Sequence, residues 1–234
     1  MSFLFSKKPK KTPTRLFFAT DIHGSERTFR KFINAGKFYN VNVIVMGGDI
    51  QGKLMIPIIK ESHGHHRATV QGRVERLTTE DELKTLTNKL DILGFYYKIM
   101  EEDEFRALQA DPKAVESLFT QLARQKMVNW VNLAEERLNG TGIKCFVTGG
   151  NEDEWDVLSA MNQDGVKSFF ACENEMVYVD DDHTMISVGI STPTPWKTPR
   201  EVSEEELGEM IDKMAALVPD MNKAIFNFHD PGKA

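Results

Sequence analysis

The chain has 234 residues, of which 41% are hydrophobic and 27% charged, a balance typical of a soluble globular protein with one sizeable core. Its formal net charge of −6 argues against a general nucleic-acid-binding surface. No apolar run approaches the roughly 18 residues of a membrane helix, so no membrane partner is expected. The two cysteines, Cys145 and Cys172, are expected to be buried, reduced thiols of a cytoplasmic protein.

Residues 1–13 form a lysine-rich segment that contains Pro9 and Pro13, and we expect a flexible basic tail there. Membrane contact through its Phe3–Phe5 stretch is the less favoured alternative. Residues 14–234 are expected to form one domain.

Short runs rich in Val, Ile and Phe predict buried strands over residues 15–20, 41–47, 143–149, 176–179, 184–190 and 224–229. Between the first two runs, Phe29, Phe32, Ile33 and Phe38 form a rough helical stripe. A strand, a helix and a strand of these lengths predict a βαβ unit with parallel strands. The sequence VDDDH at 179–183 predicts a hairpin turn between two later strands, so the sheets should be mixed.

Residues 77–139 are expected to form a helical insertion between two core strands. Thr79 followed by Glu82 is a capping-box pattern, and Asp111 followed by Pro112 is typical of a second helix start.

A proline-spaced loop precedes a further helix that should begin near Ser203, because Glu206 completes another capping box. Arg200 and Glu201 lie at this entry and could either line a binding crevice or cap the helix.

Four of the apolar runs end in residues whose side chains are of types that commonly ligate metals. Asp21 and His23 follow the first, Asp49 the second, Asn151 a later one, and His229 the last. Side chains two residues apart on an extended strand point the same way, so Asp21 and His23 should face one ligand. Each residue alone could be a turn or cap, but together they predict a metal site at the carboxyl ends of the strands.

The segments DIHG, GGD, GGNE and NFHDP, in this order, resemble the motifs of the calcineurin-like metallophosphoesterases. The resemblance covers roughly residues 14–58 and 142–231. It implies an α/β fold in which a mixed β-sandwich is flanked by helices, with the helical insertion between its halves.

The resemblance also implies a dinuclear centre with two divalent ions of Mn, Fe or Zn. Asp21 and His23 would bind the first ion, Asp49 would bridge both, and Asn151 and His229 would bind the second. A hydroxide held between the ions would hydrolyse a phosphate mono- or diester, such as a small phosphate ester or nucleotide.

The sequence departs from the family pattern at two places. Glu152 stands where the family has a histidine, and it is a candidate general acid if burial raises its pKa. The family's later GHxH motif is absent, since the chain stops five residues after His229, and we expect a truncated product with one imidazole fewer per metal. A catalytically impaired or non-catalytic member of the fold that binds a ligand or partner is therefore the alternative function.

Two other patterns are set aside. Gly64, His65 and His66 look like a displaced GHxH motif, but their position between a core strand and the insertion predicts a surface loop or hairpin tip. A nucleotide-binding α/β module is disfavoured because GGDIQGK, at 47–53, has the wrong spacing for a phosphate-binding loop.

Overall fold

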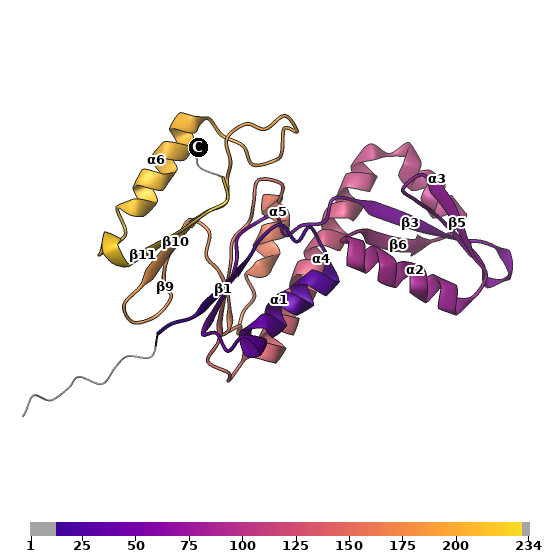
Figure 1. Ribbon diagram of the computed structural model, residues 1–234. Helices are drawn as coiled ribbons and strands as arrows, with labels where there is room; N and C mark the ends of the chain where they lie inside the picture. Colours follow the sequence, from indigo (N-terminus) through magenta and orange to yellow (C-terminus); the bar gives the residue numbers. More distant parts are fainter. Residues whose placement is uncertain (1–12, 231–234) are drawn as a thin grey trace, which may run out of the picture.

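Two β-sheets packed face to face form the core of the protein in a computed structural model that describes residues 13–230. The predicted basic tail lies, apart from residue 13, outside the described residues. Figure 1 shows this core beside a second lobe that is inserted between two of its strands. The α/β class expected from the sequence is confirmed.

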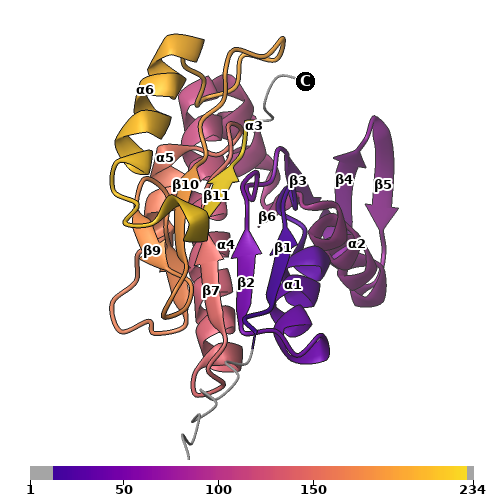
Figure 2. The same cartoon turned by 60° about the vertical axis from the view of Figure 1, so that its left-hand side comes forward.

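The first sheet has four parallel strands in the order β1-β2-β7-β8. Their bounds are Leu16–Ala19 for β1, Val43–Met46 for β2, Lys144–Val147 for β7 and Phe169–Ala171 for β8. In Figure 2 the arrows of β1, β2 and β7 point the same way, so the carboxyl ends of these strands lie at one edge of the sheet.

The second sheet has the order β11-β10-β9. Strands β9 (Met176–Tyr178) and β10 (Thr184–Val188) are antiparallel, whereas β10 and β11 (Ala224–Phe228) are parallel. The predicted hairpin and the mixed sheet are therefore confirmed.

Strand β2 shows why the core needs a continuous apolar run. Val43 and Val45 point toward the second sheet, where they pack in one cluster with Met185. Ile44 and Met46 point to the opposite face and pack beneath the helices. Since side chains alternate along a strand, a strand covered on both faces must be apolar at every position.

Helices cover the outer faces of both sheets. Helix α1 (Glu26–Phe38) buries Phe29, Phe32 and Ile33, as the helical stripe predicted, but Phe38 is 79% exposed because it lies at the end of the helix. Helix α6 (Glu204–Ala215) begins at the predicted capping box and packs on β10. The short α5 (Trp155–Leu158) follows β7 and packs against α4.

The inserted lobe corrects the prediction of a helical insertion over 77–139. Its centre is a four-stranded sheet of order β5-β4-β3-β6, built on residues that begin 22 positions earlier. The strands are β3 (Met55–Lys60), β4 (His66–Val70), β5 (Arg73–Leu77) and β6 (Tyr96–Met100). Ala68 and Val70 alternate with polar neighbours in β4, whereas β3 is almost entirely apolar. Ile56 and Ile58, two residues apart on β3, pack with them in a core under one helix, so strand periodicity, not helical periodicity, governs this half of the insertion.

Three helices complete the insertion. Helix α2 (Glu80–Leu93) has the predicted Thr79–Glu82 capping box, and α3 (Glu102–Ala110) leads into α4 (Pro112–Leu138), capped by Asp111 as predicted. Short 3-10 turns occur at η1 (Ser62–Gly64), η2 (Ser159–Met161) and η3 (Met221–Lys223).

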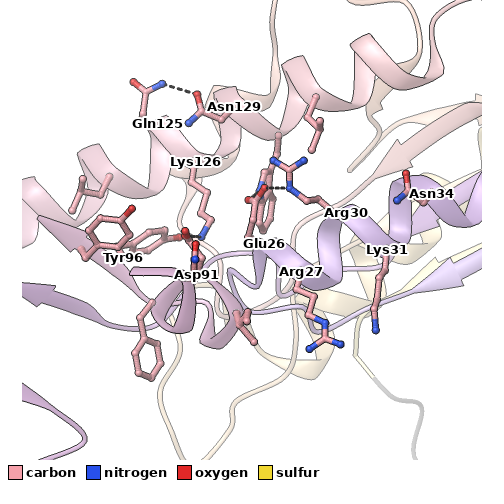
Figure 3. Close-up of a pocket in the computed structure, with 17 residues that line it drawn as sticks. Glu26, Arg27, Arg30, Lys31, Asn34, Asp91, Tyr96, Gln125, Lys126 and Asn129 are labelled. Carbon is pink, nitrogen blue, oxygen red and sulfur yellow. Dashed lines mark hydrogen bonds and ion pairs between the residues drawn. The ribbon is translucent and has the colours of Figure 1, made fainter. Parts of the chain in front are cut away.

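Helix α4 connects the lobe to the core. Its carboxyl-terminal half buries Trp130, whose ring stacks on Phe29 of α1 at 4.2 Å and whose Nε1 donates to Glu26 Oε2 at 2.5 Å. A hollow of about 930 Å³ opens beside this contact, between α1, α2 and α4 (Figure 3). Two of its cations are paired within the protein, Arg30 with Glu26 and Lys126 with Asp91.

Cys145 and Cys172 are buried and free, as expected. Of the three residues predicted to form a surface loop, Gly64 and His65 lie at the tip of the β3–β4 hairpin, whereas His66 is the first residue of β4 and is buried, so the prediction was wrong there. Within residues 13–230, none of the helices combines the length and hydropathy that crossing a bilayer requires.

Trp130→Ala is expected to lower the free energy of unfolding by about 3–5 kcal/mol, because it removes a buried aromatic side chain that joins α4 to α1. Urea unfolding followed by circular dichroism measures this change. Trp196→Ala is the matched control, since Trp196 is 78% exposed and its removal should cost less than about 0.5 kcal/mol. Equal losses in the two variants would contradict the bridging role of Trp130.

Candidate metal centre

The loops after β1 and β2 continue the pairing of their strands into the candidate site. Beyond the last paired residues, Asp21 N–H donates to Gly48 O and His23 N–H donates to Asp49 O, both at 3.0 Å. The two loops therefore advance side by side, and their side chains emerge at the same edge of the sheet. The loop after β7 brings Asn151 to this edge, and β11 of the second sheet brings His229.

His229 has oxygen atoms opposite both ring nitrogens. Nδ1 lies 3.0 Å from Gly47 O, while Nε2 lies 3.0 Å from Asn151 Oδ1 and 3.3 Å from Asp49 Oδ1. The side-chain amide of Asn151 donates to Thr198 Oγ1 at 2.8 Å, which leaves its oxygen turned toward the ring. Nε2 thus faces acceptors alone, an arrangement that needs either a second ring proton or a cation among these atoms.

The electrostatics of this pair follow from its burial. Burial lowers the pKa of His229, but the hydrogen bond and charge of Asp49 outweigh it and raise the pKa above its ordinary value. Burial raises the pKa of Asp49, but the contacts of its carboxylate with His229, the Glu152 N–H and His23 outweigh burial. The pKa of Asp49 is therefore below its ordinary value. Asp49 is therefore held as a carboxylate within the loops.

His23 lies close to Asp49, Asp21 and Glu152. His23 Nε2 is 4.0 Å from Asp49 Oδ2 and 3.9 Å from Asp21 Oδ1. His23 Nδ1 is buried without a hydrogen-bond partner, and the nearest carboxylate oxygen, Glu152 Oε2, is 3.6 Å away. Glu152 also forms an ion pair with Lys53.

These side chains form two groups that share Asp49. Asp21, Asp49 and His229 have ligand atoms within 4.8 Å of one another, and so do His23, Asp49 and Glu152. Each group combines carboxylate oxygen with imidazole nitrogen, a donor set that suits Mn, Fe or Zn. Both groups could therefore hold a divalent ion with Asp49 between the two ions.

The structure brings all five predicted ligands and Glu152 together, but it groups them differently from the sequence expectation. Asp21 shares a group with Asp49 and His229 and also lies 3.9 Å from His23, its predicted partner, while Glu152 adds a carboxylate beside His23. Sequence order could not reveal this grouping, because it depends on how far each loop turns after its strand.

The local backbone also differs from the extended geometry expected for Asp21 and His23. Strand β1 ends at Ala19, and Asp21, His23 and Asp49 have φ angles of 56°, 42° and 51°. Ile22 between the first two is buried in the core, which leaves its neighbours on the loop surface. Left-handed φ angles are uncommon outside glycine and cost energy, so they are concentrated at functional sites.

The Gly-Gly pairs allow the loops to pack on each other. A Cβ on Gly48 would lie 2.5 Å from His229 Nδ1, and one on Gly150 would overlap Asp49 Oδ1. The glycines therefore let Asp49 and His229 approach the backbone of neighbouring loops.

Asp153 is the residue that joins the Asp49 loop to the Asn151 loop. Its fully buried carboxylate accepts from the N–H groups of Gln51 at 2.6 Å, Gly150 at 2.7 Å and Ile50 at 3.0 Å. Burial raises the pKa of Asp153 to about 6, although the three backbone hydrogen bonds act in the opposite direction. No sequence pattern distinguishes this carboxylate from its neighbour Glu152, so its supporting role was missed.

Arg200 and Glu201 support the site indirectly. Arg200 is buried, and its guanidinium group pairs with Glu173. Its backbone N–H donates to the backbone oxygen of Asn151 at 3.2 Å. Glu201 accepts from Thr198 Oγ1 at 2.6 Å, and hydrogen bonds from Thr194 and Thr198 lower its pKa to about 2. Neither residue caps α6, whose cap is Ser203.

Asp153→Asn should destabilise the protein by about 2–4 kcal/mol, because the new amide group would face backbone donors wherever it is placed. It should also weaken metal binding by roughly 10- to 100-fold, since the two loops would no longer be held in register. Thermal unfolding and Mn²⁺ titration measure the two effects. Asp156→Asn, which changes an exposed carboxylate on the same segment, is the control and should change neither stability nor metal affinity. A wild-type metal affinity in Asp153→Asn would rule out the positioning role.

Comparison with known proteins gives the fold alone. No protein-family model matches the chain, and no curated protein matches its sequence. One solved crystal structure is similar, with a TM-score of 0.56 and 10% sequence identity, over 94% of this chain and 70% of that chain. At this identity the likeness supports the α/β architecture and carries no information about activity.

Proposed function

We propose that the protein is a metal-dependent phosphoesterase of the calcineurin-like type, with its centre at Asp49. The observation that carries the proposal is the environment of His229 Nε2, which lies against the oxygens of Asn151 and Asp49 with no donor opposite. A bound cation would take the place of the second ring proton and remove the conflict between these acceptors.

The arrangement supports two ions. Asp21 and His229 would hold one ion and His23 and Glu152 the other, with Asp49 as the shared carboxylate. When bound, such a pair polarises phosphate oxygens and supplies hydroxide at neutral pH. Gly47 O accepts from His229 Nδ1 and thereby directs Nε2 toward the centre, the usual means of orienting a metal-binding imidazole.

Glu152 fits a metal ligand better than a general acid. Its carboxylate lies beside the ring of His23, in one group with Asp49, and forms an ion pair with the ammonium group of Lys53. Lys53 could also contact a substrate phosphate through this position, so it would bind substrate while Glu152 holds metal.

The alternative is a non-catalytic member of the same fold that binds a ligand or partner. It is favoured by the partly open centre, in which Asp21 is half exposed, and by the lack of the family histidine at position 152. Metal uptake without hydrolysis of small phosphate esters would establish this alternative.

Asp49→Ala is expected to reduce bound Mn²⁺ from two ions per chain to one or none, because both groups lose their shared ligand. Hydrolysis of bis(p-nitrophenyl) phosphate should fall by more than about 100-fold. Atomic absorption of dialysed protein and release of p-nitrophenol measure the two outcomes. Asp212→Ala, on the exposed face of α6, serves as control; unchanged hydrolysis in Asp49→Ala would defeat the proposal.

Glu152→Gln separates the two roles of that residue. A lost ligand should weaken one metal site by about 10- to 100-fold and slow p-nitrophenyl and phenyl esters equally. A lost acid would instead slow the phenyl ester more, because its leaving group needs the proton more. We expect equal slowing, with Glu175→Gln as an exposed control; selective slowing of the phenyl ester would restore the acid assignment.

A further inference from the structure

A second hollow of about 990 Å³ adjoins the metal centre, on the side of Glu152. Its walls come from four segments that are separate in sequence: residues 51–55 after Asp49, the first turns of α4, Glu152 and Glu154 after β7, and residues 196–199 before α6. The volume falls in the range of ligand pockets. The inserted lobe and the core thus enclose this space together.

Hydrogen bonds and ion pairs connect the hollow directly to the centre. Lys53 and Glu152 both line it, and they pair with each other. Thr198, also in the wall, accepts from the side chain of Asn151. A molecule whose phosphate lies at the centre would therefore extend its remaining part into this hollow.

The far wall is apolar and accessible. Leu54, Val115 and Trp196 are 49%, 37% and 78% exposed, although the chain buries most large apolar side chains elsewhere. Phe119 and two prolines, Pro112 and Pro199, complete this wall. Apolar side chains gathered around one hollow favour an apolar ligand group, because covering them removes apolar surface from water.

The charges in the hollow limit what the ligand can carry. Glu116, Glu152 and Glu154 outnumber Lys53 and Lys197 in its lining. Further phosphate groups beyond the one at the centre would lie near these carboxylates. This distribution disfavours polyphosphates and nucleic-acid strands, which carry a charge at every unit.

We propose that this hollow binds the alcohol portion of the substrate, and that this portion is an uncharged aromatic group esterified to a single phosphate. Trp196 and Phe119, the largest side chains of the wall, provide the aromatic contacts. The inference rests on the proposed function for the position of the phosphate, whereas the preference for an aromatic group depends on the hollow alone.

The test compares binding of two non-hydrolysable probes, phenylphosphonate and methylphosphonate, to the full chain loaded with Mn²⁺, by isothermal titration calorimetry. Wild type should bind phenylphosphonate at least about tenfold more tightly, since the ring buries apolar surface in the hollow. Trp196→Ala and Val115→Asp, both at exposed positions, should reduce this preference to less than about threefold and leave methylphosphonate affinity within about twofold.

Phe38→Ala, an exposed aromatic residue on α1, is the matched control and should keep the wild-type preference. Equal affinity for the two probes, failure of phenylphosphonate to bind, or a preference that survives both pocket variants would overturn the inference. The proposed function is tested separately, by methylphosphonate binding to Asp49→Ala: binding that persists in this variant would contradict the proposed function. The ratio of the affinities for phenylphosphonate and methylphosphonate does not depend on that measurement.

Discussion

The buried carboxylate of Asp153 is the interaction on which the arrangement of the centre depends. It binds N–H groups from both the Asp49 loop and the Asn151 loop, so it fixes the distance between two segments about 100 residues apart in sequence. Burial works against this charge, as its raised pKa shows, and the backbone donors offset part of that cost. Its contribution is therefore positional: without it, the donors of both loops would be buried and unpaired.

The second constraint is the close approach of backbone at the Gly-Gly pairs. With Gly48 and Gly150 in place, His229 from the second sheet can reach the carboxylate that follows β2 in the first sheet. The two sheets thus meet at the centre as well as in the apolar core between Val45 and Met185. The contact at the centre depends on β10 and β11 being parallel, since this pairing carries the end of β11 to the same edge.

The inserted lobe adds what the core alone cannot provide. Helix α4 begins at the hollow that adjoins the metal centre and ends packed beneath the first sheet, so one helix fixes the lobe through Trp130 and places Val115 in the same hollow as Trp196. The lobe was only partly predictable: the capping signals of α2 and α4 were local and correct, whereas the short strands β3–β6 mix apolar and polar residues without a common period and lack a flanking turn signal as clear as VDDDH.

The sequence by itself determined the local features: the caps at Thr79, Asp111 and Ser203, the apolar strand β2, and the positions of the polar side chains at strand ends. These follow from hydrogen bonding and periodicity over a few residues. Only the tertiary structure decided that Asp21 and His229 share a group with Asp49, that Glu152 lies beside His23, that Asp153 holds the loops, and that a hollow adjoins the centre. Those arrangements depend on left-handed loop turns and on contacts between distant segments, which no local pattern encodes.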